Sequence, residues 1–231
     1  MTVDYCVVSI GTLSHNRLWG ETAAVRTAHA TTTLVRDKHK TILVDPSLPA
    51  PALAARLGER TGLDLSAVTD VFCTTLRPVH RRSIEALPKA AWWCSEAELA
   101  AYLRQLEDLE RIGDRLDSED SAVAVAELKL VKRFKPAPER FTDQVHLYPV
   151  VGASPGSAGL LLAPPTTTIV IAGDAALTAE HVNRGMVWEG CSDAQAAVES
   201  LRDLLEIADL IIPGHDNIML CPGRVGGAAP F

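Results

Sequence analysis

The stretch VFCTTLRPVHRRSIEALP, residues 71–88, decides how this sequence is interpreted, because it joins a strand to a turn and a helix. The apolar residues at the start of this stretch, together with the two residues before it, predict a buried strand over residues 69–74. Pro78 then breaks the extended chain, and the apolar spacing through Leu87 predicts a helix after it. Turns of this kind commonly carry the reactive groups of α/β proteins. Here the turn contains a single histidine, His80, so the stretch resembles a functional loop with few groups suited to chemistry.

Length and composition place the chain among globular proteins. It has 231 residues, of which 47% are hydrophobic, enough to bury a large core. We expect one domain over residues 1–231, because no linker rich in proline, glycine or serine separates its halves. The formal net charge is −7, with acidic and basic residues interspersed, which argues against nucleic-acid binding.

Signal-peptide, membrane-span and cysteine patterns in the sequence indicate the cellular compartment of the protein. The N-terminal residues lack the basic cluster and the apolar run of a signal peptide, and no apolar stretch is long enough to span a bilayer. The five cysteines are scattered and form no CxxC pair, which indicates buried free thiols. We therefore expect a cytoplasmic protein with no membrane partner.

Strand-like and helix-like segments follow one another in two rounds along the chain. Short apolar runs predict strands over residues 5–10, 30–36, 41–45, 69–74, 90–94, 123–131, 145–151, 158–162, 168–173 and 209–213. Helices are predicted after Pro51, after Ser95 with Glu98 completing a capping box, and after Ser192, while the charged stretch 111–120 predicts a solvated turn. Two strand-rich halves with amphipathic helices fit two stacked sheets covered by helices, a four-layered αββα sandwich of the α/β class.

Three of these strands end in polar turns that carry candidate metal ligands. His80 follows the strand over 69–74, Asp174 follows the strand over 168–173, and His215 follows the strand over 209–213. Two imidazoles and one carboxylate can hold a divalent metal and leave positions open for water or substrate. Each histidine also has a structural interpretation, because either ring can hold its own turn through a hydrogen bond.

The order of five segments resembles the metallo-β-lactamase superfamily. These segments are ILVDPSLP, VTDVFCTTLRPVH, VVGASPGSAGLLL, TIVIAGDAAL and ADLIIPGHDN, and the resemblance covers the chain from residue 30 to residue 217. It implies an αββα sandwich, in agreement with the layers predicted above. It also implies a hydrolase with one or two zinc or iron ions, since members act on lactones, thioesters, phosphodiesters and β-lactams.

The metal-binding loop of that family is matched only in part. The family loop reads His-x-His-x-Asp-His, and the corresponding residues here are Thr75, Arg77, Val79 and His80. Thr75 and Arg77 therefore replace two imidazoles of the first metal position. Val79 replaces the carboxylate that, in the family, binds the second metal and positions the attacking water.

The remaining family ligands are matched in two of three places. Ala153 stands where the family has the histidine of a Gly-His-Thr-Pro-Gly-Ser turn. Asp174 corresponds to the bridging aspartate, and His215 corresponds to the last histidine. The resemblance thus implies no two-metal centre. It leaves one candidate site, formed by His80, Asp174 and His215, with either no metal or one zinc or iron ion per chain.

Arg77 has two interpretations. Its guanidinium can take the place of the missing metal charge and pair with Asp174, which would otherwise be a costly buried carboxylate. Alternatively, it points to solvent or binds an anionic ligand. Among the other histidines, His15 and His29 lie in or near the N-terminal loop, where they can line a pocket mouth, and His181 is interpreted as structural.

Two functions from different classes follow. The first is a metallo-β-lactamase-fold protein that has lost most metal ligands and is non-catalytic or nearly inactive, with a ligand-binding or assembly role. The alternative is a mononuclear zinc- or iron-dependent hydrolase of an ester, lactone or thioester that uses His80, Asp174 and His215. A small molecule is the partner that both hypotheses allow, and homo-oligomerisation is left open.

Overall fold

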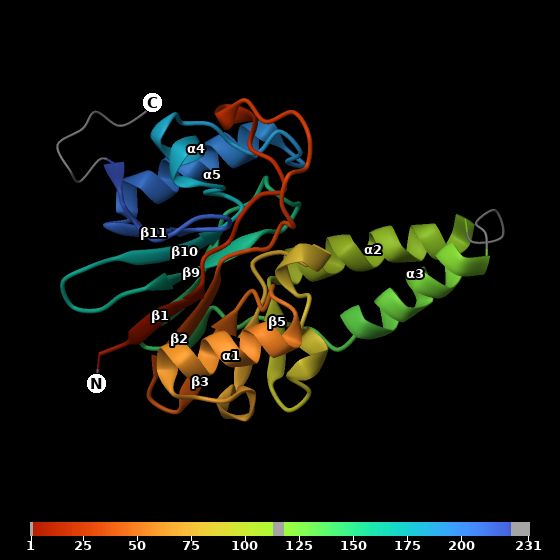
Figure 1. Ribbon diagram of the computed structural model, residues 1–231, viewed down its shortest axis with the longest axis horizontal. Coiled ribbons are helices and arrows are strands. Elements are labelled where there is room, and N and C mark those ends of the chain that lie inside the picture. The colour runs from red at the N-terminus through yellow and green to blue at the C-terminus, as the bar shows by residue number, and fades with distance from the viewer. Residues whose placement is uncertain (1, 113–117, 223–231) are drawn as a thin grey trace.

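Two six-stranded β-sheets pack face to face at the centre of the molecule (Figure 1). The structure is a computed structural model that describes residues 2–112 and 118–222. Its strands are β1 Asp4–Ser9, β2 Thr32–Asp37, β3 Lys40–Val44, β4 Asp70–Phe72, β5 Ala91–Cys94, β6 Lys135–Pro136, β7 Arg140–Thr142, β8 Val145–Pro149, β9 Ala158–Leu162, β10 Ile169–Gly173, β11 Leu210–Pro213 and β12 Met219–Leu220. The first sheet has the order β1-β2-β3-β4-β5-β6, and the second has the order β12-β11-β10-β9-β8-β7.

Helices cover the outer faces of the two sheets. They are α1 Ala50–Thr61, α2 Glu96–Ile112, α3 Ser118–Val131, α4 Ala179–Asn183 and α5 Ala194–Ile207, with short 3-10 turns η1 Arg17–Trp19, η2 Leu65–Ala67, η3 Pro78–His80 and η4 Ile84–Ala86. Within the described ranges, none of these helices is long and apolar enough to cross a membrane.

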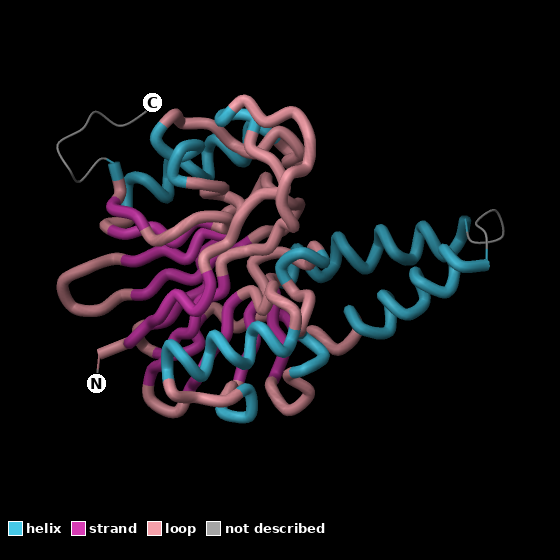
Figure 2. The backbone as a smooth tube through the Cα atoms, viewed as in Figure 1, coloured by secondary structure: helices cyan, strands magenta, loops and turns pink. Residues whose placement is uncertain are grey.

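Alternation of side chains along the strands separates an inner core from two outer cores. On β3, Ile42 faces the other sheet, whereas Leu43 points outward to the core that contains Leu53 and Leu57 of α1. On β10, Val170 points outward to the core under α5. Burying both faces of each sheet stabilises this arrangement, at about 25 cal/mol per Å² of apolar surface. The strands thus lie between α1 and α5 (Figure 2), which confirms the predicted αββα sandwich.

The predicted strand over residues 123–131 is wrong, because these residues belong to helix α3. Alternating valine and alanine produce a strand-like pattern there, but Leu128 and Val131 are both buried and lie three residues apart, as on one helix face. This face packs against α2, and the two helices project together from the sheets (Figure 1). The turn predicted over 111–120 lies partly outside the described residues, since α2 extends to Ile112 and α3 begins at Ser118.

The helix predicted after Pro78 is also wrong, and the two 3-10 turns η3 and η4 take its place. The adjacent side chains of His80 and Arg81 are both buried, and they form hydrogen bonds with different parts of the structure. His80 contacts the carboxylate of Asp45, whereas Arg81 Nε donates to the carbonyl of Leu76 at 2.6 Å. These tertiary contacts override the helical pattern of the sequence.

Helix α5 begins one residue later than predicted. Asp193, rather than Ser192, caps it, and its Oδ1 accepts a hydrogen bond from the N–H of Ala196 at 3.0 Å. Ser192 Oγ instead donates to the carbonyl of Gly152 at 3.0 Å. The start of α5 is therefore tied to the turn that contains Ala153.

Candidate functional site

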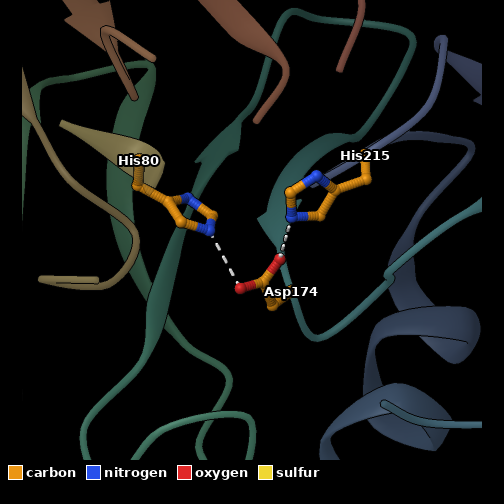
Figure 3. A group of neighbouring side chains, drawn as sticks. All are labelled: His80, Asp174 and His215. Atoms are coloured by element: carbon orange, nitrogen blue, oxygen red, sulfur yellow. Dashed lines mark hydrogen bonds and ion pairs between the residues drawn. The ribbon is translucent and has the colours of Figure 1, made fainter. Parts of the chain in front are cut away.

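The three candidate ligands predicted from the sequence lie together at one edge of the sheets (Figure 3). Strands β10 and β11 are parallel neighbours, so Asp174 and His215, which follow them, emerge at the same edge. His80 reaches this point from the loop after β4 in the other sheet. One ligand atom from each residue lies within 4.8 Å of the others, and all three side chains are buried.

Glycines on both strands allow this close approach. Gly173 has a φ of +54°, and a Cβ at this position would lie 2.6 Å from Thr74 Cβ. A Cβ at Gly214 would lie 2.7 Å from Asp174 Oδ1. Any larger residue at either position would displace the carboxylate or the strand end, so the Gly-Asp and Gly-His pairs of the sequence position the site.

His80 lies between two carboxylates. Its Nδ1 is 3.0 Å from Asp45 Oδ2, and its Nε2 is 2.9 Å from Asp174 Oδ2. Asp45 also accepts hydrogen bonds from the backbone N–H of Thr74 at 2.9 Å and from its hydroxyl at 2.7 Å. The sequence did not single out Asp45, although it follows a buried strand directly, as Asp174 does.

His215 is held by backbone carbonyls. Its Nδ1 donates towards the carbonyls of His29 at 3.0 Å and Thr12 at 3.2 Å. Its Nε2 lies 3.1 Å from Asp174 Oδ1, so the two rings approach opposite oxygens of one carboxylate (Figure 3).

Both nitrogens of each ring face hydrogen-bond acceptors. His80 lies between the carboxylates of Asp45 and Asp174, and His215 lies between the backbone carbonyls and Asp174. Burial lowers the pKa of both rings, and for His80 it outweighs the opposing effect of the nearby Asp45 carboxylate. A neutral ring carries one proton, so one of its two nitrogens faces an acceptor with a lone pair; with the proton on Nδ1, that nitrogen is Nε2, beside Asp174.

A group of converging acceptors fits a cation. Asp174 Oδ1 is buried and has no hydrogen-bond donor within the described residues. The donor set of two Nε2 atoms and one carboxylate suits a divalent ion such as zinc or iron. A carboxylate or carbonyl on the far nitrogen of each ring is also the usual outer partner of a metal-ligating histidine. The residues present therefore fit one metal ion.

Arg77 is paired with Asp174, as one of its two interpretations predicted. Its Nη2 donates to Asp174 Oδ2, and its Cζ lies 4.0 Å from the centre of the Trp188 ring. Burial lowers the pKa of Arg77 to about 10, so the guanidinium remains charged at neutral pH. The guanidinium contacts Oδ2 of Asp174, and the other oxygen, Oδ1, faces His215.

Thr75, which corresponds to the first histidine of the family loop, belongs to a different network. Thr75 Oγ1 donates to the buried carboxylate of Glu98 at 2.8 Å, as does the N–H of Leu76 at 2.9 Å. The other oxygen of Glu98 accepts from Ser154 Oγ at 2.7 Å and from the N–H of Gly156 at 3.2 Å. The sequence assigned Glu98 to a helix cap and missed this role. A structural carboxylate with four donors fills this side, and no imidazole contributes to it.

A cleft of about 520 Å³ opens above Arg77 and His215. Val79, which stands in place of the family carboxylate, lines this cleft, as do His15 and His181, whereas Ala153 is buried in its turn. The side chain of His29 lies elsewhere and lines a separate hollow beside α1.

Comparisons with known proteins agree at the level of fold. The sequence matches no family model and no curated protein. A Thermotoga maritima protein provisionally described as a metallo-beta-lactamase is 15% identical with a TM-score of 0.68, over 95% of this chain and 100% of that one. A mutant of AiiA from B. thuringiensis, with N-decanoyl-L-homoserine at its active site, is 17% identical with a TM-score of 0.65, over 94% of each chain.

A third structure differs more in length. AidC, a dizinc quorum-quenching lactonase in complex with its product, is 16% identical with a TM-score of 0.60, over 77% of this chain and 67% of that one. At these identities the similarity concerns the arrangement of strands and helices. The chain therefore has the metallo-β-lactamase fold, as its sequence motifs predicted.

Proposed function

We propose that the chain binds one divalent metal ion through His80, Asp174 and His215 and acts as a mononuclear hydrolase on an ester, lactone or thioester. The observation that carries this proposal is the convergence of both Nε2 atoms on the Asp174 carboxylate, with one ligand atom of each residue within 4.8 Å of the others. Both Nδ1 atoms also face acceptors at 3.0 Å, and Asp174 Oδ1 has no hydrogen-bond partner within the described residues, so the group has more acceptors than donors. A bound cation compensates the Asp174 carboxylate better than protonation of His80 and His215 does, because burial lowers the pKa of both rings.

Asp45 and Arg77 have separate roles beside the proposed metal ion. When bound, a divalent ion supplies a Lewis acid that polarises a substrate carbonyl. Asp45 holds His80 in the tautomer that leaves Nε2 free for the ion. Arg77 lies beside Asp174 at the floor of the cleft, where its remaining N–H groups can stabilise negative charge that develops on a substrate oxygen.

Structural neighbours support the reaction class. AidC is a lactonase, and the AiiA structure holds an acyl-homoserine at its active site. Both share the fold that brings His80, Asp174 and His215 to one edge of the sheets. Hydrolysis of a carbonyl ester bond is therefore the reaction we assign to this cleft, with one ion in place of two.

A second candidate is a metal-free binding protein. It is favoured by the ion pair between Arg77 and Asp174, which already provides one positive charge next to the carboxylate. It is also favoured by Val79, since an apolar side chain cannot position a water molecule for attack. In this case the cleft holds a small molecule without cleaving it.

Metal content separates the two candidates. Protein purified without chelator is analysed for zinc and iron, and then assayed on a panel of esters, lactones and thioesters by proton release. We expect one equivalent per chain, lost in His215→Gln and retained in His39→Gln, whose side chain is exposed in the β2–β3 turn. Wild-type protein without bound metal, and with a midpoint of unfolding that added zinc does not raise, would favour the metal-free binding protein.

A further inference from the structure

Strand β1 forms an edge of the first sheet, because β2 is its only partner strand among the described residues (Figure 1). Asp37 and Lys40 close the tight turn between β2 and β3, so they form a hydrogen-bonded pair. Every second residue of β2, counted back from Asp37, therefore bonds to β3 rather than to β1. The partners of these residues in β1 are Tyr5 and Val7, whose backbone N–H and C=O groups thus point away from the sheet.

The outward backbone groups of Tyr5 and Val7 are available for pairing. The N–H of Val3, the preceding residue that points outward, donates to Oε1 of Gln144 at 2.6 Å. Beyond the pairing with β2, no hydrogen bond within residues 2–112 and 118–222 involves the backbone of Tyr5 or Val7. A register shift between Val7 and Ser9 ends the regular edge. Between these limits the strand has no lysine or proline, which commonly protect an edge, so it can accept another strand.

A hollow of about 630 Å³ between β1 and α1 gives an added strand room. The small side chains of Ala52 and Ala55 line its α1 side, and Val8, Ser9 and Ile10 line its β1 side. Ile10 is 44% exposed, although it is a large hydrophobic side chain. A strand added beside β1 would cover part of this apolar surface.

A second copy of this chain fits the edge, because β1 can pair with itself in the antiparallel direction. If Cys6 lies opposite Cys6 of the second copy, Tyr5 of each chain lies opposite Val7 of the other. This symmetric register uses every outward N–H and C=O group of both residues, whereas a register centred on Tyr5 or on Val7 leaves some of these groups unpaired. The side chains of Tyr5 and Val7 already pack against the inner core, which would then continue from one copy into the other.

The charges beside the hollow also favour a second copy. Arg56 and Glu59 line the hollow and pair with each other, whereas Arg60, which also lines it, has no ion pair within the described residues. In the symmetric register, Asp4 of the second copy lies opposite Val8, so both side chains are on the side of the sheet that α1 covers. Oδ2 of Asp4 is bound by an arginine of its own chain, and Oδ1 is available for Arg60. The register thus brings opposite charges together.

We infer that two copies of this chain associate through their β1 strands, antiparallel and with Cys6 on the two-fold axis, so that their first sheets join. Directly opposite residues in a non-hydrogen-bonded antiparallel pair have Cα atoms about 4.5 Å apart, which is within the range of a disulfide. Cys6 is a free thiol and is only half-buried, so the symmetric register places two accessible thiols opposite each other.

Cross-linking of the full-length protein tests the register. Cys191 is the other half-buried cysteine, and the remaining three are buried, so Cys191→Ser leaves Cys6 as the accessible thiol. Copper phenanthroline, with oxygen as the oxidant, should convert Cys191→Ser to a covalent dimer. Cys6→Ser, which retains Cys191, should give no covalent dimer. A cross-link that forms through Cys191, or none in Cys191→Ser, would overturn the inference.

Charges at position 6 supply a second test. Cys6→Lys and Cys6→Glu each place like charges opposite each other on the two-fold axis, so each should weaken dimerisation by about tenfold or more. Sedimentation equilibrium measures this, and Cys6→Ser, which adds no charge, should dimerise as the wild type does. An equal mixture of Cys6→Lys and Cys6→Glu should dimerise again, because opposite charges then face each other. Loss of folding in either variant could not be reversed by mixing.

Wild-type protein that stays monomeric at every concentration would overturn the inference and leave the β1 edge to an extended segment of another protein. Dimers of Cys6→Lys and Cys6→Glu that are as stable as those of the wild type would also overturn it, since the contact would then lie elsewhere. These measurements need neither metal nor substrate, so they are independent of the proposed hydrolase.

Discussion

Two buried carboxylates, Glu98 and Asp174, are satisfied in different ways. Glu98 receives four hydrogen bonds, from Thr75, Leu76, Ser154 and Gly156. Asp174 receives one from Arg77, and its other contacts are the Nε2 atoms of His80 and His215. A carboxylate with a complete set of donors is a structural element, whereas one surrounded by acceptors is suited to a cation.

The difference lies in the groups that surround each carboxylate. On the Glu98 side, two hydroxyls and two backbone N–H groups hold the buried charge. On the Asp174 side, Asp45 and the carbonyl of His29 contact the Nδ1 atoms of the two rings, as the outer partners of metal-bound histidines do. We therefore expect the first region to contribute to stability and the second to hold the proposed metal ion.

The largest expected effect is on stability, from Glu98→Ala. The substitution leaves four buried donors without an acceptor, which should lower the free energy of unfolding by about 3–5 kcal/mol. Urea unfolding measures it, with Glu96→Ala as the control, because Glu96 is exposed on the same helix and should cost less than about 0.5 kcal/mol. Similar losses for the two variants would mean that the Glu98 network contributes little to folding.

Arg77→Met should have a somewhat smaller effect that depends on metal. In metal-free protein it leaves Asp174 buried without its only donor, at a cost of about 3 kcal/mol, the lower end for a buried pair because Arg77 is 25% exposed. Zinc should restore most of this loss, since it binds the folded state and supplies the missing charge. Arg77→His should also gain zinc affinity, because it adds an imidazole.

The decisive measurement for Arg77 is the unfolding midpoint of both variants and the wild type, each with and without zinc. A midpoint for Arg77→Met equal to that of the wild type, in chelator, would show that the pair with Asp174 contributes no stability. It would also remove the main support for the metal-free binding protein.

The contrast between the two regions also shows what the sequence can predict. His80, Asp174 and His215 each follow a buried apolar strand by a few residues, so their meeting at one sheet edge follows from the topology. Glu98 was out of reach, because its partners Thr75 and Ser154 lie 23 and 56 residues away and hydroxyl donors have no distinctive spacing. Helix α3 was missed for a related reason.

In that segment, alternating valine and alanine satisfy the pattern of a strand, and only packing against α2 decides for a helix. The four layers were predictable because most of the other strands are short, nearly continuous apolar runs, as expected for sheets buried on both faces. Local pattern therefore determines these elements, and tertiary contacts determine the remainder.

The smallest predicted effect, Asp45→Asn, tests the proton positions directly. An asparagine amide can still accept from the N–H of Thr74, so the fold should be retained. Its Nδ2 would donate to His80 Nδ1, which would shift the ring proton to Nε2 and block the lone pair that faces Asp174. We expect zinc affinity to fall by about 10- to 100-fold, as for outer partners of metal-bound histidines, which is about 1.4–2.7 kcal/mol. Competition with a zinc-sensitive dye measures this, with Asp70→Asn as the control for a buried carboxylate whose partners are Lys40 and Trp93. If both variants bind zinc as the wild type does, the tautomer of His80 does not govern the site, and the argument for a cation would rest on Asp174 Oδ1 alone.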